Sequence, residues 1–142
     1  LLANSDIYSS VLYDKKLIII VCDNGGHMVI NRLQLAKGGK EYICNIRAAR
    51  ATNLQFVDFE AHAKSMGANA ETVTSTSELE VAFLRAKKSD KTYVISLKTD
   101  GYEWLDGSAF WESPTLEVHS TTENKEAYAE FKEGKDKQRK GV

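Results

Sequence analysis

Residues 17–22 read LIIIVC and pass directly into DNGG at residues 23–26. The first stretch is apolar on both faces, which is typical of a buried parallel strand. Polar groups and glycines that follow such a strand lie at its carboxyl end, where open α/β sheets bind phosphates and metal ions. The two stretches together predict an α/β fold with a candidate ligand site at this strand end.

The same DNGG segment also fits a tight β-hairpin, because Asn-Gly between apolar runs favours a two-residue turn. In that alternative, the returning strand is MVI at residues 28–30. Two patterns favour a loop that leads into a helix. The preceding run is apolar on both faces, and the apolar residues from Met28 to Leu35 follow helical spacing.

Helix and strand signals alternate along the rest of the chain. The expected helices begin near Asn4, Met28, Asp58, Ser77 and Glu123, and the expected strands cover residues 17–22, 70–73 and 93–97. Ser77 and Glu80 match a capping box, and Asp58 is a good N-cap. Residues 40–55 lack a clean period and are predicted to be mostly loop. The alternation indicates right-handed crossovers between parallel strands, and therefore a doubly wound, mostly parallel sheet.

The composition limits the class of protein. The chain has 142 residues, of which 42% are hydrophobic and 27% charged, as in an ordinary globular domain with a real core. We expect a binding domain in residues 1–115 and a helical tail in residues 116–142. A formal net charge of -1 gives no general attraction for nucleic acid or anionic membranes, so neither is an expected partner.

The number of cysteines and the first residues of the chain lead to expectations about cellular location and about the length of the protein. Cys22 and Cys44 are too few for a disulfide framework, which predicts a reducing, cytoplasmic location. No apolar run is long enough to span a bilayer. The chain opens on LLA without an initiator Met, and we expect it to be a fragment of a longer protein.

The DNGG segment also contains the candidate ligands. The side-chain oxygen of Asn24 and glycine carbonyls suit a hard cation such as Mg²⁺. Gly25 and Gly26 let the backbone approach a ligand closely. His27 follows them, where its ring could contact a bound diphosphate, although a lone loop histidine is more often uninvolved. No nucleophile elbow or Walker-type phosphate loop occurs in the sequence, so no catalytic residue is assigned.

Three segments resemble the cofactor-binding domain of thiamin-diphosphate-dependent enzymes. They are NSDI at residues 4–7, VCDNGG at residues 21–26 and VINRLQ at residues 29–34. In that family a Gly-Asp-Gly turn begins the metal motif, and an asparagine further along the chain completes it. Asn24 is the matching position. The Gly-Asp-Gly turn is absent and would lie just upstream of Leu1, so the resemblance implies a thiamin-diphosphate-binding fold that is truncated at its N-terminus.

The resemblance also implies a set of ligands. Asn24 would give its side-chain oxygen to Mg²⁺, and Gly26 would give its backbone carbonyl. Gly25 and the backbone around His27 and Met28 would lie along the diphosphate of thiamin diphosphate. In this family the glutamate that activates the cofactor belongs to a different domain, usually of a second subunit. The implied partners are therefore other domains and a second copy of the parent enzyme, and this fragment alone is expected to be inactive.

Within the family, further segments look most like trihydroxycyclohexanedione hydrolases of inositol catabolism. They are VDF at residues 57–59, AKSMG at 63–67, GYE at 101–103 and EVHS at 117–120. That likeness implies a small cyclic dione substrate, whose ring opens by carbon–carbon cleavage. Two alternatives remain: an enzyme similar to acetolactate synthase or to decarboxylating thiamin enzymes, and a non-catalytic α/β module that binds a nucleotide or a protein partner.

Overall fold

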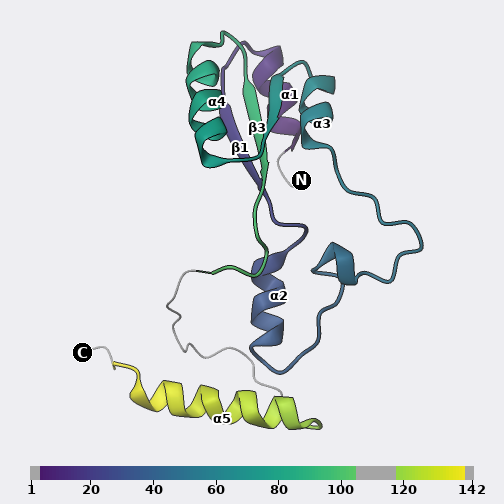
Figure 1. Cartoon of the computed structure of the whole chain (residues 1–142), viewed down its shortest axis with the longest axis vertical. Coiled ribbons are helices and arrows are strands. Elements are labelled where there is room, and N and C mark those ends of the chain that lie inside the picture. Colours follow the sequence, from purple (N-terminus) through teal and green to yellow (C-terminus); the bar gives the residue numbers. More distant parts are fainter. Residues whose placement is uncertain (1–3, 105–117, 140–142) are drawn as a thin grey trace. The chain divides into compact units, whose positions relative to one another are not determined.

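A computed structural model of the chain describes residues 4–104 and 118–139 (Figure 1). The elements in chain order are α1 (Asn4–Leu12), β1 (Ile18–Asp23), α2 (Met28–Leu35), the short 3₁₀ helix η1 (Ile46–Ala48), α3 (Phe59–Ser65), β2 (Asn69–Val73), α4 (Thr76–Lys88), β3 (Tyr93–Lys98) and α5 (Thr122–Lys137). The order of helices and strands agrees with the sequence prediction. The hairpin alternative is wrong, because residues 28–30 belong to α2.

The chain forms two compact units. The first runs up to Gly25 and from Gln55 to Asp100, and the second runs from Gly26 to Leu54 and from Gly101 onward. The division predicted from the sequence, at residues 115 and 116, falls outside the described residues and stays a prediction. The stretch YEWLDGSAFW at residues 102–111, whose aromatic side chains are predicted to pack against another domain or to line a pocket, is described only as far as Trp104.

The first unit contains a parallel sheet of three strands in the order β1-β3-β2. On one side of β3 the register pairs Ile18 with Tyr93, and on the other side it pairs Asn69 with the same Tyr93. β3 is therefore the central strand, although it is the last strand of the described chain. The carboxyl ends of all three strands lie at the same edge of the sheet.

Helices cover both faces of this sheet (Figure 1). On one face, α1 and α3 bury Ile7 and Ala63 against Val94. On the other face, α4 buries Ala82 and Ala86 against Ile95 and Val73 of the strands. Successive side chains of a strand point to opposite faces of the sheet. Val94 therefore packs in the apolar cluster on one face, and its neighbour Ile95 packs in the cluster on the other face. The doubly wound α/β fold is confirmed.

The start of α4 differs from the prediction. The N-cap is Ser75, whose hydroxyl accepts a hydrogen bond from the backbone N–H of Glu78 at 3.2 Å. Glu78 in turn accepts from the backbone N–H of Thr74 at 2.7 Å. Ser77, the predicted cap, lies inside the helix. Both serines have a glutamate three residues later, and the earlier pair lets the helix begin sooner. The predicted cap of α3 is confirmed, because Asp58 accepts from Ala61 N–H at 2.9 Å.

In the second unit, α5 begins against the turn that follows α2. The side-chain amide of Asn124 donates to the carbonyl of Lys37 at 2.9 Å. Gly38 has a φ of 73°, and a Cβ there would lie 2.5 Å from the carbonyl oxygen of Glu123, so only glycine allows this approach. The Lys37 ammonium lies 4.3 Å from the ring centroid of Phe131. Of the helices that the structure describes, none is both long and apolar enough to cross a membrane.

Candidate cofactor and metal site

The strand end in the first unit is organised by Asp23. Its side-chain Oδ1 accepts a hydrogen bond from the backbone N–H of Gly25 at 3.0 Å, which forms an Asx turn around Asn24. The carbonyl of Asp23 accepts from Thr99 N–H at 2.9 Å, next to the end of β3. Gly25 has a φ of 82°, a conformation that favours glycine. The first half of the DNGG segment is therefore a defined turn at the carboxyl edge of the sheet.

The second half of the segment leads into α2 in the second unit. The backbone N–H of His27 donates to the carbonyl of Cys44 at 2.7 Å, and Gly26 forms an antiparallel bridge with Asn45. A Cβ on Gly26 would lie 2.2 Å from the Cys44 oxygen, so this position has no room for a side chain. Met28, the first residue of α2, is buried. The Gly26–His27 backbone is thus held against the turn at residues 42–45.

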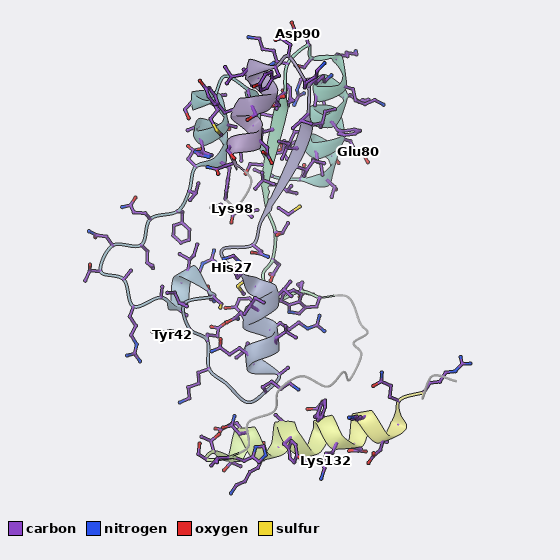
Figure 2. All side chains as sticks on the ribbon, turned by 180° about the vertical axis from the view of Figure 1, so that it is seen from behind. His27, Tyr42, Glu80, Asp90, Lys98 and Lys132 are labelled. Atoms are coloured by element: carbon purple, nitrogen blue, oxygen red, sulfur yellow. The ribbon has the colours of Figure 1, made fainter. Side chains whose placement is uncertain are left out.

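The five predicted ligand residues are consecutive, but they fall into two units. Asn24 and Gly25 belong to the first unit, and Gly26, His27 and Met28 belong to the second. His27 is exposed, and Figure 2 shows it at the start of α2. The structure shows the backbone conformation of these residues. Their predicted roles as ligands of a metal ion or a diphosphate stay predictions.

A polar cluster in the second unit was not predicted from the sequence. Glu41 Oε1 accepts hydrogen bonds from Asn31 Nδ2 at 2.8 Å, from the Tyr102 hydroxyl at 2.8 Å and from Asn45 Nδ2 at 3.2 Å. Asn45 Nδ2 also donates to the Tyr102 oxygen at 2.8 Å. Asn31 and Asn45 are each 1% exposed, so two amide side chains occupy the interior of this unit. One feature of the sequence could have indicated that Asn31 is buried. It lies three residues after the apolar Met28, and this spacing places both residues on the same face of α2.

These contacts set the charge of the cluster. Hydrogen bonds from Asn31, Tyr102 and Asn45, in that order of size, lower the pKa of the Glu41 carboxyl. The hydrogen bond to Glu41, together with burial, raises the pKa of the Tyr102 phenol. Glu41 is therefore a carboxylate and Tyr102 a neutral phenol at neutral pH. Asn31 Oδ1 is buried and has no hydrogen-bond partner.

The histidines and acidic residues of the described ranges do not assemble a metal centre: no group of three His, Cys, Asp or Glu side chains there could hold an ion. His62 Nε2 lies 3.4 Å from Asn4 Nδ2, and the ring of His119 stacks on Tyr128 with centroids 4.5 Å apart. The use of the Asn24 side-chain oxygen and the Gly26 carbonyl for Mg²⁺, which the family resemblance implies, stays a prediction.

The first unit has a groove of about 510 Å³ beside β2 and α4. It contains none of the predicted ligand residues. On its wall, Glu71 accepts hydrogen bonds from the Arg85 guanidinium and from the Tyr93 hydroxyl. The hydrogen bond from Arg85 is the largest cause that lowers the pKa of Glu71. Glu71 and Arg85 therefore pair with each other in this groove, and Glu78, a further charged lining residue, accepts hydrogen bonds from the backbone N–H and the hydroxyl of Thr74.

Comparison with known proteins shows the family to which the chain belongs. Residues 2–97 match the family model described as "Thiamine pyrophosphate enzyme, C-terminal TPP binding domain". The match covers more than half of the chain, and the chain belongs to this family. No solved structure gave a significant match.

Two curated relatives carry the name 3D-(3,5/4)-trihydroxycyclohexane-1,2-dione hydrolase. The protein of Halalkalibacterium halodurans is 34% identical over 134 residues, which are 90% of this chain and 20% of the relative. The protein of Bacillus subtilis is 31% identical over 141 residues, 95% of this chain and 21% of the relative. The chain therefore spans about one fifth of the length of the curated relatives it matches.

Proposed function

We propose that this chain supplies the diphosphate- and Mg²⁺-binding part of a thiamin-diphosphate-dependent enzyme. The observation that carries the proposal is the DNGG segment, which begins at the last residue of β1, at the carboxyl edge of a parallel sheet. The family match supports thiamin diphosphate as the ligand. The names of the relatives support the finer proposal that the parent enzyme opens the ring of a trihydroxylated cyclohexanedione by carbon–carbon cleavage with water.

The chemistry of the donors fits the proposed ligands. Mg²⁺ is usually held by few protein oxygens together with phosphate oxygens, and an Asn24 side-chain oxygen and a Gly26 carbonyl are donors of this kind. Gly25 adopts a positive φ and Gly26 has no space for a Cβ, so both positions present bare backbone. When bound, thiamin diphosphate would supply a nucleophilic carbon and a thiazolium ring that delocalises the electron pair left by carbon–carbon cleavage. The role of this chain is to bind and orient it.

The rest of the proposal concerns the parent protein. We propose that its other domains and a second copy supply the activating glutamate and the pocket for the cyclic dione. We further propose that the parent works in the cytoplasm and that this chain alone does not turn over substrate. Turnover of the dione by the purified chain of 142 residues would contradict the last point.

The test uses Asn24→Ala in the longest available form of the protein. Because Asn24 would hold the ion that in turn holds the diphosphate, we expect Mg²⁺ and thiamin diphosphate to weaken together, by about tenfold or more. Isothermal titration calorimetry measures both affinities. Asn53→Ala is the matched control, because Asn53 is exposed in the second unit.

Two outcomes of this titration would contradict the proposal. One is an unchanged affinity for the cofactor in Asn24→Ala. The other is binding of a nicotinamide or adenine nucleotide by the wild-type protein in place of thiamin diphosphate, which would favour a nucleotide-binding module. If thiamin diphosphate binds but pyruvate rather than the cyclic dione is consumed, the family assignment stands and the proposed substrate is wrong.

A further inference from the structure

We propose that Glu41 is a positioning residue, which holds the Gly26–His27 backbone in place through the turn at residues 42–45. The consequence for the metal ion rests on the proposed function, but the positioning itself does not. In this proposal Glu41 does not contact substrate or cofactor. It acts through the residues that it ties together.

The first argument is the number of segments that meet at one oxygen atom. Glu41 Oε1 accepts from Asn31 of α2, from Asn45 next to η1 and from Tyr102, which follows β3 in the chain. The three donors come from parts of the sequence that are far apart. A single carboxylate therefore joins α2, the turn and the Tyr102 segment of the second unit.

The second argument is the contact between the turn and the glycine loop. Cys44, in the turn, accepts the His27 N–H at 2.7 Å, and Asn45 bridges to Gly26. Gly26 packs so closely on the Cys44 carbonyl that a methyl group would overlap it. A shift of the turn therefore moves the Gly26–His27 backbone with it.

The third argument is the cost of losing the carboxylate. Asn31 and Asn45 are almost completely buried. A buried polar group that loses its hydrogen-bond partner destabilises the folded state, because its lost hydration is no longer compensated. Asn31 Nδ2 has Glu41 as its acceptor, whereas Asn31 Oδ1 is buried and already lacks a donor, so Asn31 is incompletely hydrogen-bonded even with Glu41 in place. Without Glu41, Asn31 Nδ2 loses this acceptor and Asn45 Nδ2 keeps only the Tyr102 oxygen, so we expect the turn to be held less firmly at Asn45.

This arrangement deepens the proposed function. If the Gly26 carbonyl binds Mg²⁺, its direction depends on the turn, and the turn depends on Glu41. A residue distant from the DNGG segment in sequence then sets the geometry of the metal shell. Charge-assisted hydrogen bonds are stronger than neutral ones, which explains why a carboxylate rather than an amide suits this place.

The experiment measures amide hydrogen exchange in the whole chain by NMR. In Glu41→Ala we expect the His27 amide to exchange at least about tenfold faster, because its acceptor on Cys44 is no longer held. Glu41→Gln keeps an acceptor oxygen and should restore most of the protection. Glu41→Leu keeps most of the bulk without an acceptor and should not restore it, whereas a role through packing alone would let both variants restore it. Glu130→Ala, on the exposed side of α5, is the matched control and should leave His27 unchanged.

Unchanged exchange at His27 in Glu41→Ala would overturn the proposal, and so would equal acceleration by Glu41→Ala and Glu130→Ala. A second measurement separates this proposal from the proposed function. If wild-type protein binds Mg²⁺ with thiamin diphosphate, Glu41→Ala should weaken Mg²⁺ and Glu41→Gln should recover it. If the wild type binds neither, the proposed function fails while the exchange result still decides the role of Glu41.

Discussion

The two units of the chain differ in the balance of apolar and polar side chains that they bury. In the first unit the central strand buries Val94 and Ile95, and both faces of the sheet are closed by apolar side chains of helices. In the second unit the most buried side chains include Asn31 and Asn45, whereas Val29 and Ile30 of α2 are 58% and 51% exposed. Apolar contacts predominate in the interior of the first unit, whereas two of the buried side chains of the second unit are amides hydrogen-bonded to the carboxylate of Glu41.

The largest expected effect tests the apolar core of the first unit. Ile95→Ala should reduce the free energy of unfolding by about 2 to 5 kcal/mol, because it removes buried methyl groups and leaves a cavity. Chemical denaturation followed by circular dichroism measures the loss. Ile20→Ala is the control, since Ile20 is 43% exposed on the same sheet and should cost clearly less. Equal losses would show that β3 is not the centre of the core.

Lowering the pH tests whether the negative charge of Glu41 stabilises the second unit. The pKa of Glu41 lies below its ordinary value of 4.5 because Asn31, Tyr102 and Asn45 donate to it. When the folded state has the lower pKa, the stabilisation is complete above the unfolded pKa and is lost as the pH falls through the folded pKa. We expect the exchange protection of α2 to fall in that window, and Glu41→Gln to remove this pH dependence.

The first unit supplies the comparison for this acid experiment. Arg85 lowers the pKa of Glu71 in the same direction, but Glu71 lies at the edge of the sheet, outside the apolar core. The amides of β3 should therefore keep their protection in wild type and in Glu71→Gln while those of α2 lose theirs. Parallel loss in α2 and β3 would remove the distinction between the units.

The smallest expected effect concerns one helix end. Ser75→Ala should cost about 1 kcal/mol of stability, because the N–H of Glu78 loses its side-chain acceptor. Ser77→Ala lies within α4 and should change the unfolding free energy by less. Thermal unfolding of the two variants decides between them. A larger loss in Ser77→Ala would restore the cap predicted from the sequence.

Local signals predicted most of the first unit. The apolar run before Asp23, the cap at Asp58 and the alternation of helix and strand were sufficient for a doubly wound sheet. The strand order was not predictable, because nothing local places β3 between β1 and β2. The cap of α4 was misplaced, because Ser75 and Ser77 offer the same spacing to a glutamate.

The candidate site was predicted unevenly. The DNGG segment stands out in the sequence because a strand and two glycines adjoin it. The Glu41 cluster does not, because Asn31 and Tyr102 are far apart in sequence and residues 40–55 have no regular period. The ligand roles of Asn24 and Gly26 come from the family resemblance, so they need the binding experiment.

Cys22 gives the unaltered chain a chemical handle. It carries a free, exposed thiol in β1, two residues before Asn24, whereas Cys44 is partly covered in the second unit. A maleimide fluorophore or spin label attached to Cys22 places a spectroscopic reporter beside the strand end without any substitution. Ligand arrival at the DNGG segment can then be followed in real time by the environment of that label.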